Sequence, residues 1–100
     1  MKVFYLCHLC VTLNNIYFVE INYTKNKFYS RIVIRDNGLG ISKKDLPHIF
    51  ERFYKGHNSS KDSVGIGLAL AKSIIEKDNG SISVKSTPNI GTIFTIKFFE

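Results

Sequence analysis

The chain has little cysteine and lacks a long apolar run, and each shortage excludes a class of protein. Two cysteines among 100 residues are too few for a disulfide scaffold. No stretch reaches the roughly 18 apolar residues of a membrane-spanning helix. A content of 44% hydrophobic and 22% charged residues is ordinary for a globular domain and excludes collagen-like repeats, a coiled coil and wholesale disorder. The length predicts one small domain or part of a larger protein, and excludes a multidomain enzyme.

Positive charge is in excess. The chain has 14 Lys and Arg residues against 8 Asp and Glu, which gives a net charge of +6. This balance favours acidic partners, and composition leaves nucleic acid, anionic lipid and nucleotide phosphate open. We expect no nucleic acid, because the aromatic residues alternate on predicted strands as core residues do and no RNA-binding aromatic signature is present.

The N-terminal segment is mostly apolar over residues 3–13. It lacks the small-residue cleavage site of a signal peptide, so it predicts a buried strand or helix, between which periodicity does not choose. Cys7 and Cys10 have the spacing of a metal or redox pair. Because zinc needs four ligands and only His8 is near, two buried thiols are predicted instead.

Alternating apolar and polar residues predict two β-hairpins. Residues 16–23 and 28–35 alternate as half-buried strands and are separated by a polar turn. Residues 81–86 and 92–99 form the second pair, around a turn at 88–91.

Two helices are predicted between the hairpins. Ser42, with a carboxylate three residues on, resembles a helix start, and a short helix should continue through Phe50 or Phe53. A longer helix follows Gly67. Its apolar stripe contains Leu70, Ile74 and Ile75, with Ala71 alongside. This order predicts an α+β fold, a two-layer sandwich of a mostly antiparallel sheet with helices packed on one face.

Two glycine clusters are the most informative motifs. Asp36 precedes Gly38 and Gly40, so its carboxylate could accept a hydrogen bond from a ligand amine or could cap a turn. Gly65 and Gly67 precede the longer helix, where bare backbone N–H groups could receive a phosphate. The second cluster is not a P-loop, because no Gly-Lys-Ser/Thr follows. Taken alone, each cluster is typical of an ordinary turn or loop.

Three motifs occur together and in order. They are Asp-Asn-Gly-Leu-Gly-Ile at 36–41, Ile-Phe-Glu-Arg-Phe-Tyr at 49–54 and Gly-Ile-Gly-Leu-Ala-Leu-Ala at 65–71. This combination resembles the ATP-binding domain of sensor histidine kinases, within the wider gyrase, Hsp90, histidine kinase and MutL ATPase superfamily. The resemblance runs from about Ile16 to Glu100 and implies the histidine-kinase-type ATPase fold in an incomplete form.

The resemblance implies a role for each matching residue of the first motif. Asp36 matches the carboxylate that accepts a hydrogen bond from the adenine amino group, and a buried acceptor there would select the base. Gly38 and Gly40 match glycines that let the backbone pass close to the nucleotide. Ile41 would line the adenine pocket.

The other two motifs match the lid and the phosphate end of the family's site. Phe50 and Phe53 match aromatic residues that anchor the lid, and plain core packing is their alternative. The cations of the lid, which could meet the triphosphate, are Lys55, His57 and Lys61. The residues that match the second glycine motif are Gly65, Gly67 and Leu68, the last packed beneath the glycines. No catalytic residue is identified, since nothing around His57 resembles a phosphoacceptor motif.

The resemblance fails at the N-terminus. The family places an Asn-containing helix there, at roughly residues 1–13, which holds Mg²⁺ against the phosphates. The sequence does not match it, and neither Cys nor His suits Mg²⁺. ATP is therefore the expected cofactor, with Mg²⁺ expected for the family but no metal ligand in this chain. Residues 1–15 are interpreted as a divergent segment replacing that helix, and residues 16–100 as the C-terminal part of an N-terminally truncated domain.

The predicted function is that of an ATP-binding domain fragment of a two-component sensor histidine kinase, which positions ATP for phosphoryl transfer to a His on a separate domain. The alternative is a non-catalytic nucleotide-binding or protein-interaction module. The implied partners are ATP or ADP, a histidine-containing dimerisation domain and a response regulator. Either a homodimer or poor solubility is also predicted, because the missing helix would expose apolar surface. The expected location is cytoplasmic, with no membrane segment here and a membrane anchor in the intact kinase.

Overall fold

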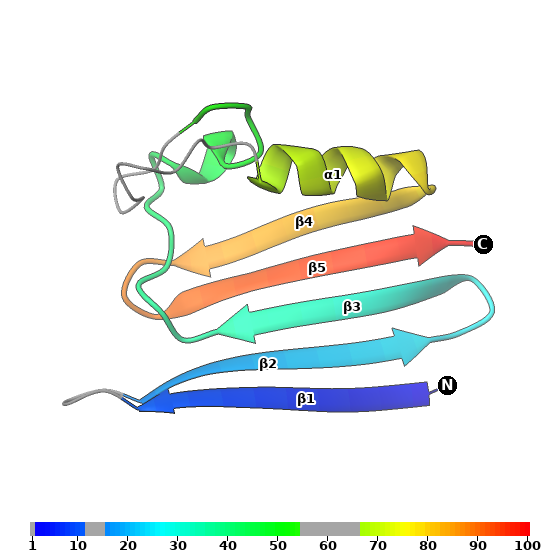
Figure 1. Ribbon diagram of the computed structural model, residues 1–100, viewed down its shortest axis with the longest axis horizontal. Helices are drawn as coiled ribbons and strands as arrows, with labels where there is room; N and C mark the ends of the chain where they lie inside the picture. Colours follow the sequence, from blue (N-terminus) through cyan, green and yellow to red (C-terminus); the bar gives the residue numbers. More distant parts are fainter. Residues whose placement is uncertain (1, 12–15, 55–66) are drawn as a thin grey trace.

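The computed structural model describes residues 2–11, 16–54 and 67–100, and gives only the backbone of the first strand. The elements are β1 (Lys2–Val11), β2 (Ile16–Lys25), β3 (Tyr29–Asp36), the 3₁₀-helix η1 (Leu46–His48), α1 (Gly67–Lys77), β4 (Gly80–Thr87) and β5 (Gly91–Phe99). The strands form one sheet in the order β1-β2-β3-β5-β4, and every neighbouring pair is antiparallel. α1 and η1 lie along the β4 side of this sheet (Figure 1). The predicted α+β class and antiparallel sheet are confirmed.

Both predicted hairpins are present, as the pairs β2–β3 and β4–β5. The first turn is held by the Asn26 side chain, whose oxygen accepts hydrogen bonds from the backbone N–H groups of Phe28 and Tyr29 at 2.8 and 3.0 Å. This is the local side-chain turn that Asn favours. The hairpins join through β3 and β5, a pairing between distant segments that sets Asp36 opposite Thr92.

The two faces of the sheet differ in polarity. Residues directly opposite one another across an antiparallel pair share a face, so the register assigns each side chain. Gly80 faces α1, because a Cβ there would lie 2.8 Å from the Ile75 side chain. The strand residues that share this α1 face include Val19, Ile21, Tyr23, Ile32, Ile34, Ile82, Val84, Phe94, Ile96 and Phe98. The opposite, polar face carries Glu20, Arg31, Arg35, Lys85 and Lys97.

The N-terminal run is a strand, which decides between the two alternatives left by the sequence. β1 pairs with β2 along its whole length, from Lys2 opposite Lys25 to Val11 opposite Ile16. It forms one edge of the sheet. The prediction of two buried thiols concerns side chains outside the described residues and stays a prediction.

The predicted short helix after Ser42 is wrong, because only the single 3₁₀ turn η1 forms before Tyr54. Pro47 stands in the first turn of η1, where proline is tolerated, so it does not account for the missing helix. Phe53 has a φ of 63°, in the left-handed region, which is incompatible with a continuing helix. The Ser42 hydroxyl accepts a hydrogen bond from the N–H of Asp45 at 3.1 Å, so the helix-start motif makes a local turn instead.

α1 buries less of its apolar stripe than predicted. Ile75 is 8% exposed, but Leu70 and Ile74 are 56% and 55% exposed. The prediction is therefore confirmed for Ile75 and wrong for the other two. The reason is that α1 packs on β4 at the edge of the sheet, and only the side of the helix around Ile75 meets the strands.

Replacing Ile75 with Ala should lower the free energy of unfolding by about 2–4 kcal/mol, because it removes the buried contact between α1 and the sheet and leaves a cavity. The control is Ile90→Ala, which deletes the same atoms from a side chain that is 69% exposed. We expect this control to cost less than about 0.5 kcal/mol. Urea denaturation measures both, and equal losses would contradict the role of Ile75.

Candidate functional site

The first glycine motif forms a loop that crosses the β4–β5 turn (Figure 1). The N–H of Asn89 in the turn donates a 2.7 Å hydrogen bond to the carbonyl of Leu39 in the loop. The N–H of Ile41 donates to the Ser86 hydroxyl at 2.8 Å. We call this contact, between residues 37–41 and residues 86–91, the loop–turn clamp.

Glycine is required at two positions of the loop–turn clamp. Gly40 has a φ of 72°, and a Cβ there would lie 2.3 Å from the carbonyl oxygen of Thr87. Gly91 has a φ of 150°, and its Cβ would lie 2.1 Å from the carbonyl oxygen of Asp36. Neither space admits a side chain. Gly40 therefore serves the contact between two backbone segments, and the predicted role of Gly38 and Gly40 beside a nucleotide stays a prediction.

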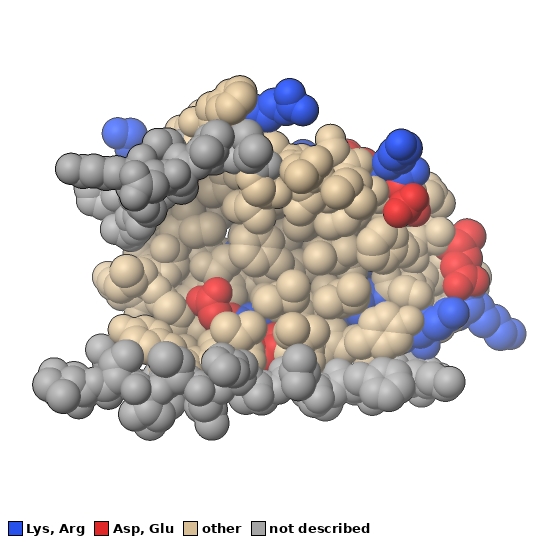
Figure 2. Space-filling model, in the orientation of Figure 1, with Lys and Arg blue, Asp and Glu red and all other residues tan. Residues whose placement is uncertain are grey.

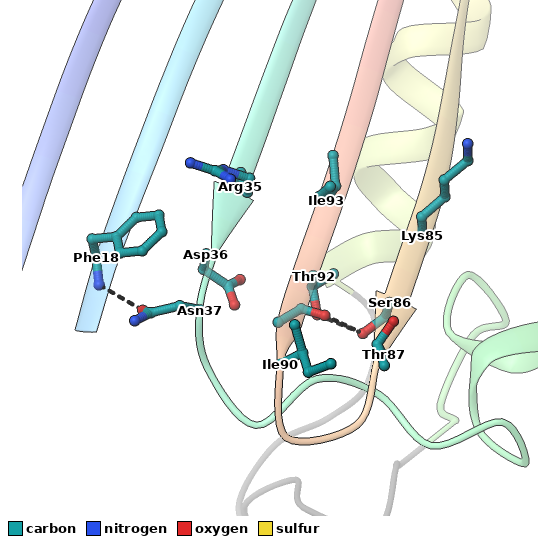
Figure 3. A pocket seen from close by; sticks show the side chains of 11 residues that line it. Phe18, Arg35, Asp36, Asn37, Lys85, Ser86, Thr87, Ile90, Thr92 and Ile93 are labelled. Atoms are coloured by element: carbon teal, nitrogen blue, oxygen red, sulfur yellow. Dashed lines mark hydrogen bonds between the residues drawn. The ribbon is translucent and has the colours of Figure 1, made fainter. Parts of the chain in front are cut away.

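Asp36 ends β3, and its carboxylate extends toward β5 (Figure 3). Its Oδ1 accepts a 2.9 Å hydrogen bond from the N–H of Gly38, so the turn-capping alternative is present. Its Oδ2 receives no hydrogen bond from the described residues and can accept one from a ligand amine. The neighbouring Asn37 ties the loop to β2, since its Oδ1 accepts a 2.8 Å bond from the N–H of Phe18.

Two hydroxyl groups beside Asp36 were not predicted. Thr92 lies opposite both Asp36 and Ser86 in the sheet register and is 6% exposed. Ser86 donates its one proton to the carbonyl of Gly91 at 2.9 Å, so the Thr92 hydroxyl donates to Ser86 across 2.8 Å. Strand alternation in the sequence predicts that Thr92 shares a face with Phe94. The sequence carries no signal that β5 pairs with β3, and this pairing sets Thr92 beside Asp36.

A hollow of about 320 Å³ opens at this end of the sheet (Figure 3). This volume is at the lower end of the range for small-molecule sites. The lining residues are Phe18, Arg35, Asp36, Asn37, Lys85, Ser86, Thr87, Ile90, Gly91, Thr92 and Ile93. The Arg35 guanidinium lies 5.2 Å from the centre of the Phe18 ring and 3.4 Å from a Glu20 oxygen. Arg35 and Lys85 line the hollow from the polar face, whereas Asp36, Ser86 and Thr92 belong to the α1 face in the register. The predicted Ile41 does not line the hollow.

The aromatic motif places its two phenylalanines differently. Phe50 packs edge-on against Phe94 of β5, with ring centres 6.5 Å apart, and the Lys72 ammonium of α1 lies 5.3 Å from the Phe50 ring centre. Phe53 is 66% exposed. Core packing therefore describes Phe50 but not Phe53. Their role as anchors of a lid stays a prediction.

Asp45 holds the segment between the glycine loop and the aromatic motif. It is 7% exposed, and its two carboxylate oxygens accept hydrogen bonds from the hydroxyls of Tyr54 at 2.6 Å and Ser42 at 2.9 Å. The Tyr54 ring also stacks on His48, which pairs with Glu51. The hydrogen bond to Asp45, followed by desolvation and the Asp45 charge, raises the pKa of Tyr54 above its ordinary value of 10.0.

The second glycine motif is described only from Gly67 onward. Gly67 is the first residue of α1, and a Cβ there would meet no atom within 4 Å. Leu68 is 37% exposed. The other predicted residues of the lid and phosphate end lie outside the described residues: Lys55, His57, Lys61 and Gly65.

The described residues do not fit a Mg²⁺ site. Where the family places its Asn-containing helix, the structure has β1, a strand without an Asn residue. No group of three or more His, Cys, Asp or Glu side chains that could hold a metal occurs within residues 16–54 and 67–100 or elsewhere in the described chain. In the same residues, no helix is long and apolar enough to cross a membrane.

Comparison with known proteins places these features in one family. Residues 11–100 match the family described as histidine kinase-, DNA gyrase B-, and HSP90-like ATPase. The chain is 39% identical over 83 residues to the sensor histidine kinase YvrG of Bacillus subtilis, a match that covers 80% of this chain and 14% of YvrG. It is 44% identical over 80 residues to the heme sensor protein HssS of Staphylococcus saprophyticus, which covers 80% of this chain and 17% of HssS.

A solved structure agrees with the sequence matches. The mycobacterial sensor histidine kinase MprB superimposes with a TM-score of 0.66 and 28% identity, covering 81% of this chain and 56% of the MprB chain. The present chain therefore spans 14% and 17% of the two curated relatives and just over half of the solved structure.

Replacing Gly40 with Ala should destabilise the protein by more than about 2 kcal/mol, because the left-handed backbone and the clash with the Thr87 carbonyl oppose a side chain together. Gly67→Ala is the matched control, since its Cβ enters open space at the start of α1. It should be neutral or stabilising by up to about 1 kcal/mol. Thermal and urea unfolding of both variants measure this difference. A Gly40→Ala protein as stable as the wild type would contradict the loop–turn clamp.

Tyr54→Phe should destabilise the protein at neutral pH but much less at alkaline pH. The raised pKa means that the bond to Asp45 contributes its full stability below the ordinary tyrosine pKa of 10.0, and that this contribution is lost as the pH rises through the higher folded-state pKa. The measurement is the free energy of unfolding of wild type and variant at pH values on either side of 10. A difference between the two proteins that does not change with pH would contradict the bond.

Proposed function

The chain belongs to the histidine kinase-, DNA gyrase B-, and HSP90-like ATPase family, and we propose that it is the nucleotide-binding part of a two-component sensor histidine kinase. In this role it binds ATP and positions the γ-phosphate for transfer to a His on a separate domain. Since the chain spans 14% and 17% of its two curated relatives, the histidine-containing dimerisation domain and the response regulator belong to the proposal as partners. So do a cytoplasmic location and the membrane anchor of an intact kinase.

The observation that carries the proposal is the position of Asp36. Its carboxylate stands at the end of β3, next to a hollow of about 320 Å³, and Gly38 occupies only one of its oxygens. The other oxygen can accept a hydrogen bond from the exocyclic amine of adenine. A base without that amine would leave the acceptor unpaired, which is the way that such sites discriminate between similar ligands.

The phosphates would lie near the start of α1, on the α1 face to which Asp36 belongs in the register, and not in the hollow, most of whose strand residues belong to the polar face. The first turn of α1 contains no acidic residue, and Gly67 leaves its backbone open to an approaching anion. Lys55, His57, Lys61 and Gly65 are proposed to act at this end. Phosphoryl transfer in such proteins depends on positioning and on stabilising charge, so the chain needs no nucleophile of its own.

A second candidate is a nucleotide-binding or protein-interaction module that lacks kinase activity. The observation that favours it is β1, a strand where the family has the Mg²⁺-holding Asn helix. The family match begins at residue 11. We propose that residues 1–15 are a divergent segment and that residues 16–100 are the C-terminal part of the ATP-binding domain. The chain alone would then bind the nucleotide without phosphorylating itself.

Asp36→Asn should weaken ATP binding by at least about tenfold, because it removes a charge-assisted hydrogen bond to the adenine amine. The measurement is calorimetric titration with ATP, ADP and inosine triphosphate, each with and without Mg²⁺. Inosine carries a carbonyl oxygen in place of the amine. The wild type should prefer ATP, and the variant should shift its preference toward inosine triphosphate, because the Asn amide can donate to that oxygen.

Asp78→Asn provides the matched control. It makes the same chemical change at an exposed position just after α1, and it should leave both affinities and their ratio unchanged. Binding that depends on the base but not on Mg²⁺ would favour the second candidate. An Asp36→Asn protein with unchanged preference, or a folded wild type that binds no adenine nucleotide, would contradict the proposed function.

A further inference from the structure

The polar face of the sheet carries positive charge that the described chain does not neutralise. Seen as in Figure 1, the molecule presents mainly uncharged surface over the strands, with most Lys and Arg at its margins (Figure 2). The register puts four cations on the polar face instead, namely Arg31, Arg35, Lys85 and Lys97. Within β2–β5, Glu20 is the one acidic residue that shares this face, and it pairs with Arg35 at 3.4 Å. β1 contains no Asp or Glu, so three of the four cations have no acidic partner on the described strands.

Two of these cations lie directly opposite each other. Arg31 of β3 is paired with Lys97 of β5 in the register, and such opposite residues have Cβ atoms only about 4.5–5.5 Å apart. Like charges in this position destabilise a sheet. Hydroxyls continue the row on both sides, with Thr24 of β2 opposite Arg31 and Ser81 of β4 opposite Lys97. We call these four residues the donor row, because each side chain can donate a hydrogen bond and none is negatively charged.

The two cations of the donor row are not engaged by acceptors of the described chain. Arg31 Nε is buried without a hydrogen-bond partner, which leaves a donor of the guanidinium unused by the protein. Lys97 makes no ion pair with the described residues, and its ammonium lies 4.9 Å from the centre of the Tyr29 ring. This cation–π contact holds the ammonium without neutralising it. Glu100, the acidic residue nearest to Lys97 in the sequence, pairs with Lys25 at 3.5 Å.

We propose that the donor row binds a phosphate monoester group, on the face of the sheet opposite to the proposed nucleotide site. A phosphate monoester carries a charge of about −1.5 to −2 at pH 7 and three terminal oxygens. Arg31 and Lys97 together balance this charge, whereas a carboxylate would leave one of the two cations uncompensated. The planar guanidinium of Arg31 can bind two phosphate oxygens at once, and Lys97 adds a compact positive charge beside it.

An aromatic surface adjoins the donor row and bears on what carries the phosphate. Phe99 lies opposite Tyr29, on the same face as Arg31 and Lys97 and two residues further along the strands. The two rings meet edge-on with their centres 6.4 Å apart, and Phe99 is 47% exposed. Two residues of a strand span about 7 Å, so a ring that carries the phosphate can contact Phe99 while its oxygens meet the cations. Free phosphate lacks this contact, and the two sources should therefore differ in affinity.

Titration of the full chain with small anions, followed through backbone amide NMR signals at a constant ionic strength of about 0.15 M, tests the proposal. Phenyl phosphate should bind with a dissociation constant of about 1 mM or tighter and should shift the signals of Arg31, Lys97 and Ser81. Weaker binding of inorganic phosphate would assign the site to phosphate carried on a ring, and equal binding would assign it to free phosphate. Benzoate and dimethyl phosphate should bind at least about fivefold more weakly, because each carries a single negative charge.

Replacing Arg31 and Lys97 together with Gln should raise the dissociation constant for phenyl phosphate at least about tenfold. The matched control replaces Arg35 and Lys85 with Gln, which removes the same two charges from the same face. Arg35 lies four residues from Arg31, about 13 Å along β3, which exceeds the Debye length of about 8 Å at this ionic strength. The control should therefore change the constant less than about twofold.

Two further readouts keep the test valid if the double variant does not fold. The titration of the wild type needs no substitution. Lys97→Gln alone should leave the unliganded chain at least as stable as the wild type, since it removes the like-charged neighbour of Arg31, and phenyl phosphate should raise the Tm of the wild type more than that of this variant. Asp36→Asn should bind phenyl phosphate as the wild type does, whether or not it binds ATP.

Four results would overturn the proposal. The first is a titration whose shifts are spread over Lys and Arg signals of the whole chain. The second is benzoate or dimethyl phosphate binding as tightly as phenyl phosphate does. The third is a loss of affinity in the Arg35 and Lys85 control as large as that in the Arg31 and Lys97 variant. The fourth is a loss in Asp36→Asn, which would place the phosphate in the nucleotide site instead.

Discussion

The loop–turn clamp is the contact on which the site depends. The Ser86 hydroxyl accepts hydrogen bonds from the N–H of Ile41 and from the hydroxyl of Thr92. It donates one to the carbonyl of Gly91. It therefore holds together the loop after β3, the β4–β5 turn and the start of β5. Because Gly40 and Gly91 have no side chains, these backbones approach to distances that no other residue allows. This close approach of the backbones fixes Asp36 beside Thr92 at the rim of the hollow.

The clamp also bears on the two tasks of the proposed nucleotide site. The proposed recognition of the base uses the strand ends, where Asp36 is held by Gly38 and by the β3–β5 pairing. The proposed recognition of the phosphates uses the start of α1, a helix that packs on the sheet through Ile75. The two proposed tasks therefore fall to different elements of the fold.

Coverage of the sheet is the second constraint on the molecule. Among the described residues, no helix lies over β2 and β3, and Ile75, at 8% exposed, is the one apolar side chain that is buried. A core this small gives little hydrophobic stabilisation. The chain makes up for part of this with polar contacts, such as the two hydroxyls on Asp45, and with the pairing of all five strands.

The sequence alone determined the local structure. The alternation of apolar and polar residues predicted both hairpins, and glycine and asparagine predicted their turns. The order of the three motifs identified the ATPase family. Each of these signals depends on residues close together in the chain. It failed for the segment after Ser42, where local turns replace the expected helix. It also failed where distant contacts decide: Leu70 and Ile74 are exposed because only the tertiary structure sets which side of α1 meets the sheet. Thr92 and Ser86 join Asp36, and Lys85 joins Arg35, only through strand pairings across tens of residues, whose register no local pattern encodes.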